Sequence, residues 1–319
     1  MKLATWIAAC AVSLGAAFSA QAAWPEHPVN LIVPYPAGGG VDPVARLVGQ
    51  KLSERWGQPV VVQNKAGASG SIGAAYVARA KPDGTTIMMS ATAEVVINQF
   101  LMTQMPYDPE QDLVPVTLAV RLPFILVANP KQPYATMPEL LAYARQHPGD
   151  VTYASSGNGT PQHLAGVLLE ELAGVKLAHI PYKGVAPSVS ALLAGKVSIG
   201  FVGLPTGQPY VQSGQLKPLG LSSRTPSDAA PGTAPLAQTP GLEKFELNQW
   251  FGIFVPAGTP DDVVQQIQQD VAAVLQMPDV RKILVAQGAE PSGMPTAEFR
   301  EFVKAERQKF HDIVKAGNL

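Results

Sequence analysis

The sequence predicts an α/β protein built from two lobes with a cleft between them. Two series of alternating strand and helix patterns indicate this fold class, because such alternation is typical of sheets covered by helices. Extended segments join the two series. The chain has 319 residues, of which 46% are hydrophobic and 15% are charged. This composition supplies a large core and excludes a disordered or fibrous protein.

The first series contains three strand–helix units. The apolar run Val29–Val33 leads through a glycine-rich stretch into a helical pattern that ends near Leu52. Strands at 60–62 and 86–89 each lead into another helical pattern, and the first of these is alanine-rich and reaches Ala80. Three such units in succession predict a parallel sheet with helices on its faces.

The second series begins after Pro115. A strand at 124–127 is followed by a helix that Thr136 is placed to cap. Further strands and helices alternate along the chain, with strands at 151–154, 177–180 and 197–202 and helices at 161–172 and 186–193. The stretch 224–241 is rich in proline, alanine, threonine and serine, so we expect a long connection there, followed by a strand at 251–255.

Two amphipathic helices end the chain. The first begins at Thr259-Pro260-Asp261-Asp262, with Thr259 as the expected cap and the acids near the positive end of the helix. Its expected buried face consists of Val263, Ile267, Val271 and Val274. The last helix begins near Thr296 and carries an apolar stripe, made of Phe299, Phe302, Val303, Phe310 and Ile313.

The first 22 residues are interpreted as a cleaved secretory signal. Lys2 precedes an apolar run, and Ala20-Gln21-Ala22 matches a small-residue cleavage site; an uncleaved anchor is the alternative. The single cysteine, Cys10, lies within this signal, so the mature chain has no disulfide and no thiolate ligand or nucleophile. The formal net charge is −1 without blocks of like charge, which argues against nucleic acid or an anionic membrane surface as a partner.

Three loops between strands and helices are the candidate binding elements, because ligands of open α/β sheets sit beyond the carboxyl ends of the strands. The first, residues 35–42, contains three consecutive glycines that expose backbone N–H groups, and Asp42 is placed to cap the next helix. The others are residues 67–70 and 155–160, which add hydroxyl groups. Amides and hydroxyls at helix N-termini suit an anionic ligand.

Motifs for catalysis, nucleotides and metals are missing from the sequence. It contains no P-loop, no G-x-G-x-x-G fingerprint and no G-x-S-x-G elbow. The histidines do not have metal-ligand spacing; they are His27, His147, His163, His179 and His311. Only His163 lies near a candidate loop, where a capping or supporting role competes with a catalytic one. We therefore expect no enzyme activity, no cofactor and no metal.

Several short motifs together indicate a family. They are Tyr35-Pro36-Ala37-Gly38-Gly39 with Asp42 and Arg46, Asn64-Lys65-Ala66-Gly67-Ala68-Ser69-Gly70, Pro82-Asp83-Gly84, Tyr153-Ala154-Ser155-Ser156-Gly157 and Pro181-Tyr182-Lys183-Gly184. In this order and spacing they resemble the Bug proteins, the periplasmic solute-binding components of tripartite tricarboxylate transporters. The likeness extends from about Trp24 to the C-terminus.

The resemblance implies a two-lobe periplasmic-binding-protein fold, also called a Venus flytrap. Residues 23–122 with 224–319 would form the first lobe and 123–223 the second, with hinges near 122–127 and between 216 and 255. Family ligands are small carboxylates, held between the two lobes partly through ordered waters. The implied ligand-binding residues are Tyr35, Pro36, Ala37, Gly38, Gly39, Asp42, Ala68, Ser69, Ser90, Thr92, Ser155, Ser156, Gly157, Asn158, Thr160, His163 and Gly203.

Two departures from the family pattern bear on the ligand. Ala37 replaces a proline found in many relatives, and Phe201-Val202-Gly203-Leu204 stands where many relatives carry Asp or Asn. A ligand ammonium group would lose a partner there, so we expect a dicarboxylate or an aromatic carboxylate. The expected partners are the membrane permease subunits of a tripartite transporter or a sensor ectodomain, and the protein is expected to be a monomer. An exported enzyme acting on a small acid, or a lobe pair that has lost its ligand, are the alternatives.

Overall fold

The computed structural model describes residues 24–38 and 40–319. The predicted signal segment, with Cys10, and Gly39 of the first loop lie outside these residues. No helix in the described part of the chain is both long and apolar enough to span a bilayer.

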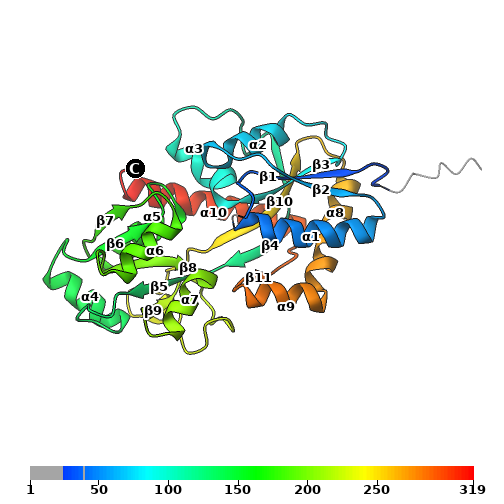
Figure 1. Ribbon diagram of the computed structural model, residues 1–319. Coiled ribbons are helices and arrows are strands. Elements are labelled where there is room, and N and C mark those ends of the chain that lie inside the picture. The colour runs from blue at the N-terminus through cyan, green and yellow to red at the C-terminus, as the bar shows by residue number, and fades with distance from the viewer. Residues whose placement is uncertain (1–23, 39) are drawn as a thin grey trace, which may run out of the picture.

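Two separate sheets form the frame of the molecule (Figure 1). The larger sheet has the order β11-β4-β10-β3-β1-β2. Its strands are β1 (Val29–Val33), β2 (Val60–Asn64), β3 (Thr86–Ala91), β4 (Leu113–Leu122), β10 (Gln249–Pro256) and β11 (Glu290–Pro291). β2, β1 and β3 run parallel, as the first series predicts. Beyond β3, each further strand pairs antiparallel with the one before it: β10 with β3, β4 with β10 and β11 with β4.

The smaller sheet has the order β7-β6-β8-β5-β9. Its strands are β5 (Phe124–Ala128), β6 (Thr152–Ser155), β7 (Ala178–Pro181), β8 (Ile199–Gly203) and β9 (Lys217–Leu221). β7, β6 and β8 run parallel, and β5 pairs antiparallel with β8 and β9. The two sheets with their helices confirm the predicted α/β class with two lobes.

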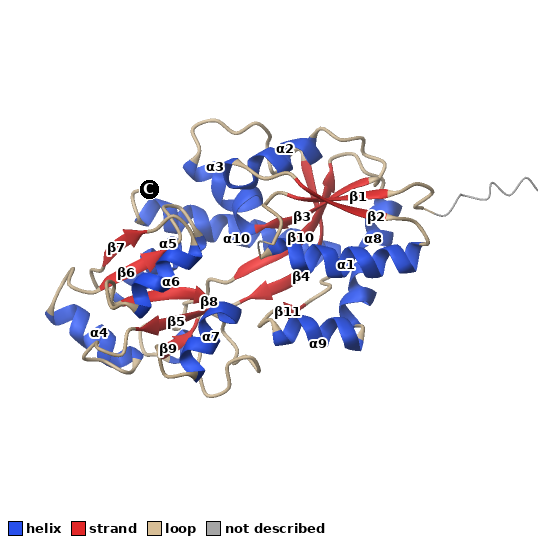
Figure 2. Ribbon diagram, in the orientation of Figure 1, coloured by secondary structure: helices blue, strands red, loops and turns tan. Residues whose placement is uncertain are grey.

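Helices cover both faces of the sheets (Figure 2). They are α1 (Val41–Trp56), α2 (Ser71–Ala78), α3 (Asn98–Leu101), α4 (Met137–Gln146), α5 (Pro161–Ala173), α6 (Val185–Leu193), α7 (Leu204–Gln212), α8 (Asp261–Gln276), α9 (Pro278–Ala286) and α10 (Thr296–Ala316). β1 shows why its apolar run is continuous: Leu31 and Val33 pack with α1 and α8, whereas Ile32 packs with α2 and α10. A parallel strand covered on both faces can bury successive side chains, and in β1 Asn30 alone is partly exposed.

The backbone crosses between the sheets at a buried polar junction. β4 ends at Leu122 and β5 begins at Phe124, so Pro123 alone joins them. The Phe124 N–H donates to Ser222 Oγ at 2.8 Å, and that hydroxyl donates to Asn248 Oδ1 at 2.8 Å. This network fixes both crossing segments to one another.

The long connection after β9 packs on the smaller sheet. The Leu221 N–H donates to the Ala234 carbonyl at 2.9 Å, and the Phe245 ring stacks on Phe201 of β8 at 5.8 Å between centroids. The stretch before β10 therefore packs on the smaller sheet.

The C-terminal helix α10 bridges the two halves of the structure. The predicted stripe is buried at Phe299, Val303, Phe310 and Ile313, and the helix packs against both β4 and α5. At its centre, Trp250 Nε1 donates to Glu306 Oε2 at 2.9 Å. Each such apolar side chain contributes roughly 1.5–3 kcal/mol on burial, so this helix is a major part of the core.

Several local expectations need correction. Asp42 does not cap α1, because the helix already begins at Val41 and Asp42 lies inside its first turn. Thr259 does not cap α8, which begins at Asp261; its hydroxyl donates to the Pro256 carbonyl at 2.8 Å. Val263 is only half-buried, and the neighbouring Val264 occupies the core. The predicted cap at Thr136 is confirmed, since Thr136 and Glu139 form a capping box.

Elements that the sequence did not predict are β4, β9, β11, α7 and α9. Prolines explain why β4 and α7 were not predicted. Pro115 lies within β4 beside a register shift against β10, where the sheet tolerates an irregular residue. Pro209 lies within α7, so a proline that normally ends a helical pattern is accommodated there.

Packing between α5 and β6 generates a stability prediction. A Cβ at Gly166 would lie 2.2 Å from Cε2 of Tyr153, whose ring is buried. We expect Gly166→Ala to lower the free energy of unfolding by about 1–3 kcal/mol, because the ring must shift within a packed core. Urea unfolding measures this difference. Gly203→Ala is the matched control, since nothing lies within 4 Å of its Cβ position; equal stability of both variants would contradict the prediction.

Candidate functional site

The first predicted loop is braced by Asp42. Its carboxylate accepts hydrogen bonds from the Gly38 N–H at 3.0 Å, from Arg46 Nε at 2.9 Å and from Asn64 Nδ2 at 2.9 Å. The Arg46 bond, aided by Gly38 and Asn64, lowers the pKa of Asp42 to about 2. Asp42 is therefore charged, and its carboxylate oxygens are engaged in hydrogen bonds within the protein. The neighbouring Pro36, Ala37 and Gly38 are exposed.

The second loop contains left-handed backbone at residues that are not glycine. Ala68 and Ser69 have φ values of 45° and 51°. A residue other than glycine in this left-handed conformation carries a strain energy of order 1–3 kcal/mol. Asn98 Nδ2 donates to the Ser69 carbonyl at 2.9 Å and holds this conformation. Both residues are exposed. Backbone strain retained at an exposed loop is typical of a ligand-contacting segment.

The segment 90–92, at the end of β3, is buried rather than open. Ser90 Oγ donates to the Ala91 carbonyl at 2.7 Å, and Thr92 Oγ1 accepts from the Trp250 N–H at 3.4 Å. Both side chains are at most 1% exposed. Their predicted contact with a ligand would therefore require this segment to move.

Glu94 is the residue that the sequence analysis missed. It is completely buried beneath the first and second loops, where it accepts from the Tyr35 hydroxyl at 2.7 Å and from the Ala91 N–H at 2.6 Å. Burial raises the pKa of Glu94 to about 7 although these hydrogen bonds favour the charged form. The pKa of Tyr35 is raised by burial and by this carboxylate, so Tyr35 remains a donor. An acid in an apolar helical pattern gives no sequence signal of such a contact.

The lobe-two loop, residues 155–160, is held by its own side chains. Ser155 is buried, and its Oγ accepts from the Gly157 N–H at 3.1 Å. Thr160 caps α5: its hydroxyl accepts from the His163 N–H at 3.4 Å and donates to the Gly157 carbonyl at 2.7 Å. Ser156 Oγ donates to Gln162 Oε1 at 3.1 Å, and Asn158 is exposed. Ser156, Asn158 and the loop backbone are thus the groups closest to solvent.

His163 lies under this loop and not in the open cleft. It is 5% exposed, and its Nδ1 accepts from the Gly159 N–H at 3.0 Å. Desolvation lowers its pKa. The structure thus favours the supporting role among the alternatives that the sequence left open.

The loop 155–160 of the smaller sheet contacts α3 beside the larger sheet. A Cβ at Gly159 would lie 2.4 Å from Cδ1 of Leu101 in α3, so the second-lobe loop contacts the first lobe. The carboxyl ends of β1, β2 and β3 share one sheet edge, and those of β6, β7 and β8 share another. Gly203 at the end of β8 borders open space. This arrangement offers backbone amides, hydroxyls and the N-termini of α1 and α5 to an anion.

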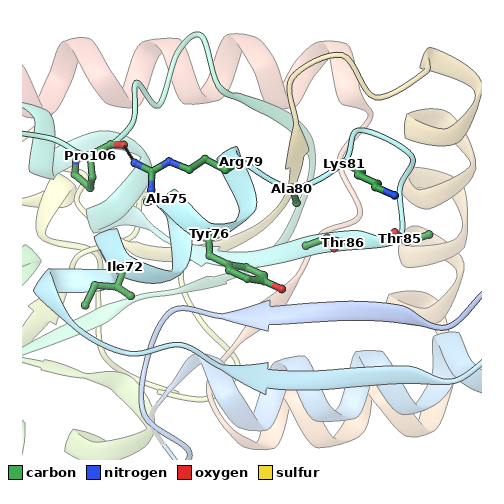
Figure 3. A pocket seen from close by; sticks show the side chains of 9 residues that line it. All are labelled: Ile72, Ala75, Tyr76, Arg79, Ala80, Lys81, Thr85, Thr86 and Pro106. Atoms are coloured by element: carbon green, nitrogen blue, oxygen red, sulfur yellow. Dashed lines mark hydrogen bonds between the residues drawn. The ribbon is translucent and has the colours of Figure 1, made fainter.

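A hollow of about 710 Å³ lies elsewhere, beside α2 (Figure 3). It is lined by Ile72, Ala75, Tyr76, Arg79, Ala80, Lys81, Thr85, Thr86 and Pro106. Thr86 begins β3, so the hollow extends toward the opposite end of that strand from the segment 90–92, and no predicted site residue lines it. Among the described residues, no group of three histidine, cysteine or acidic side chains is arranged to hold a metal ion.

A family model describes this chain. Residues 44–319 match the model of the tripartite tricarboxylate transporter family receptor, TctC. The chain belongs to this family. That assignment confirms the resemblance to the Bug proteins, and it agrees with relatives that span the same length.

Two relatives illustrate the family. A UPF0065 protein from the tcbD-tcbE intergenic region of Pseudomonas sp. is 36% identical over 292 residues, covering 92% of this chain and 87% of the relative. Protein BugT of Bordetella pertussis is 33% identical over 293 residues, covering 92% and 90%.

Solved structures with bound acids have the same fold. Rpa4515 of R. palustris with adipate is 32% identical, with a TM-score of 0.80 over 92% of this chain and 98% of that chain. MatC (Rpa3494) from the same species, with bound malate, is 28% identical, with a TM-score of 0.75 over 91% of this chain and 100% of that chain. TctC-family chains of this length are thus solute-binding proteins of the two-lobe type.

Glu94 leads to a pH-dependent prediction. Because its pKa in the folded protein is raised from 4.5 to about 7, the folded state binds this proton more tightly than the unfolded chain between those pH values. The free energy of unfolding should therefore fall as pH rises from about 4.5 to 7, by up to about 3 kcal/mol from this residue. Glu94→Gln should lack that part of the fall.

Urea unfolding at several pH values between 4.5 and 8 measures the effect as the difference between variant and wild type. Glu171→Gln, at an exposed position of α5, is the matched control and should follow the wild type. Parallel pH profiles for Glu94→Gln and wild type would show that Glu94 does not carry the dependence.

Proposed function

We propose that this protein captures a small carboxylate between its two lobes in the periplasm and delivers it to a tripartite tricarboxylate-type permease. The observation that carries the proposal is the loop 155–160, which begins α5 and faces α3 of the other lobe across the contact between Gly159 and Leu101. Adipate and malate in the related R. palustris structures support a carboxylate as the ligand class. The N-terminal signal would direct export and then be cleaved. We expect the mature chain to be a monomer.

The proposed lobes follow the two sheets. The first comprises 23–122 and the chain from β10 onward, and the second comprises 123–223 with the connection that packs on β8 and β9. Pro123 and the residues around Asn248 are the proposed hinges, because the backbone crosses between the sheets at these two points, which Ser222 links by hydrogen bonds. A ligand that contacts both lobes favours the closed arrangement by its differential affinity for it.

Recognition would depend on backbone and hydroxyl donors. Asp42 is paired with Arg46, so the first loop can approach an anion without a free negative charge. Ser156, Asn158 and the N-terminal turn of α5 supply donors from the other side. Bonds of this kind to a carboxylate are charge-assisted and stronger than neutral ones, and waters can complete them.

The proposed ligand has no ammonium group. Phe201 and Val202 are buried in the second lobe, and Gly203 presents only backbone to the open space. No carboxylate or amide at the end of β8 would pair with an ammonium ion. A dicarboxylate or an aromatic carboxylate is therefore favoured over an amino acid. A sensor ectodomain is the alternative recipient, and the buried or internally bonded polar groups of the loops support binding rather than catalysis.

A ligand panel tests the proposal. Mature protein, refolded to remove bound cargo, should gain thermal stability with adipate, malate or benzoate, because a ligand that binds only the folded state raises Tm. Aspartate and glutamate should give no shift at the same ionic strength, with sodium chloride as the control. A shift with amino acids alone would contradict the proposed ligand class, and silence across all acids would contradict carboxylate binding.

Ser156→Ala tests the loop directly. Loss of one hydroxyl donor should raise the Kd for the acid that gives the largest shift by about fivefold, since one hydrogen bond contributes about 1 kcal/mol. Isothermal titration calorimetry measures this change. Ser213→Ala is the matched control, because that exposed hydroxyl donates to the Tyr210 carbonyl at the end of α7. Equal affinities for both variants would remove Ser156 from the site.

A further inference from the structure

We propose that His163 and His179 hold the loop 155–160 in its binding conformation only while His163 is neutral, so that protonation of His163 in acid loosens the loop and releases the ligand. The inference deepens the proposed function, on which its ligand-binding consequence rests. Both residues act as positioning residues, because they lie beneath the loop rather than at its surface.

The two rings form a stacked pair. His163 comes from the first turns of α5 and His179 from β7, and their centroids are 3.8 Å apart with an angle of 11° between the planes. Tyr153 of β6 stacks on His179 at 4.8 Å and extends the column. Side chains from all three elements that surround the loop thus meet directly below it.

The protonation state of His163 follows from its bond. The Gly159 N–H donates to Nδ1 at 3.0 Å, and a backbone N–H can only donate, so Nδ1 carries no proton and acts as the acceptor. Protonation of His163 would convert Nδ1 into a second donor facing the Gly159 N–H. The bond would be lost, and the two groups would repel each other.

His179 supports the opposite end of the loop. Its Nε2 lies 2.6 Å from Ser155 Oγ. The same oxygen accepts from the Gly157 N–H at 3.1 Å and lies 3.0 Å from the Gly157 carbonyl. Ser155 donates its one hydroxyl proton to that carbonyl, so His179 Nε2 donates to Ser155 Oγ, a role that the imidazole fills whether it is neutral or protonated. The pair therefore fixes the loop at Ser155, Gly157 and Gly159.

The surroundings favour the neutral form of both rings. Burial lowers the pKa of His163, and burial together with the neighbouring His163 lowers the pKa of His179 to about 4. The titratable groups from the packed elements are Tyr153 of β6 and Glu170 of α5. Glu170 accepts a hydrogen bond from the Leu177 N–H, and burial together with the charge of Glu170 raises the pKa of Tyr153. Two positive imidazoles in contact would repel each other, so protonation of one opposes protonation of the other.

The support is connected to the contact between the lobes. Gly159, whose N–H is held by His163, has a left-handed φ of 72°, and a Cβ there would collide with Leu101 of α3. A change in this peptide therefore alters both the loop backbone that would face the ligand and the surface that meets the first lobe. Protonation of His163 would therefore weaken ligand binding in two ways, through the loop backbone and through the contact with the first lobe.

The experiment compares non-titrating replacements. In His163→Asn the side-chain oxygen can still accept from the Gly159 N–H but cannot take up a proton at these pH values, whereas His163→Ala removes the acceptor. Adipate is the probe, and calorimetry gives its Kd at pH 7.5 and pH 4.5. The ratio of the two Kd values should be at least about fivefold larger for the wild type than for His163→Asn. Protonation of adipate affects every variant equally and cancels in this comparison.

His147→Asn is the control, a surface histidine at the end of α4 in the same lobe, and its ratio should equal that of the wild type. Equal ratios for wild type and His163→Asn would overturn the proposal.

Amide exchange by NMR tests the support without any ligand. In the wild type, the protection of the Gly159 amide should fall by at least about tenfold between pH 7.5 and 4.5 after correction for intrinsic rates. His163→Asn should keep its protection at both pH values, and folded His163→Ala should lose it at both. Imidazole ¹⁵N shifts should report an unprotonated Nδ1 for His163 at pH 7.5. Protection that is independent of pH in the wild type would overturn the proposal.

The two tests separate the possible failures. If adipate does not bind at pH 7.5 but Gly159 exchange follows the predicted pattern, the ligand proposal is wrong and the histidine support stands. If adipate binds with the same pH ratio in wild type and His163→Asn, the ligand proposal stands and the histidine support is wrong. Should His163→Ala fail to fold, His163→Asn still decides the result.

Discussion

The loops of this protein depend on one constraint: a strand-to-helix turn can offer its amides to a ligand only if its remaining polar groups are satisfied from beneath. Buried side chains meet that requirement in both lobes. In the first, Asp42 accepts from the Gly38 N–H and Glu94 accepts from Tyr35. In the second, His163 accepts from the Gly159 N–H. All three acceptors are at most 5% exposed, so each loop is built on an interior group.

Charge around the candidate site is kept low. The whole sequence has a formal net charge of −1, and Asp42 is neutralised by Arg46. Burial favours the neutral forms of Glu94 and of the two stacked imidazoles. The proposed anion site would rely on the N-termini of α1 and α5 and on backbone amides rather than on a dedicated cation. Such a site would discriminate by geometry, which is compatible with the adipate and malate bound in two related structures.

Much of the fold could be predicted from the sequence. The parallel strands such as Val29–Val33 follow from short apolar runs bounded by glycine and proline, and the cap at Thr136 follows from local hydrogen-bonding chemistry. β4 was not predicted because a proline such as Pro115 normally interrupts a strand. It is accommodated here beside the register shift against β10. Asp42 and Thr259 were misplaced as caps because a helix start moves by one or two residues without changing the pattern.

For the candidate site, the sequence by itself determined the loops and their chemistry, because clustered glycines and hydroxyl residues after apolar strands are local features. Only the tertiary structure decided what lies beneath them. Glu94 reaches Tyr35 across 59 positions of sequence, and His179 reaches Ser155 from a neighbouring parallel strand. Such contacts depend on the order of strands within a sheet and on the packing of helices over it. Neither leaves a periodicity in the chain, so the interior supports became visible only when the distant segments were brought together.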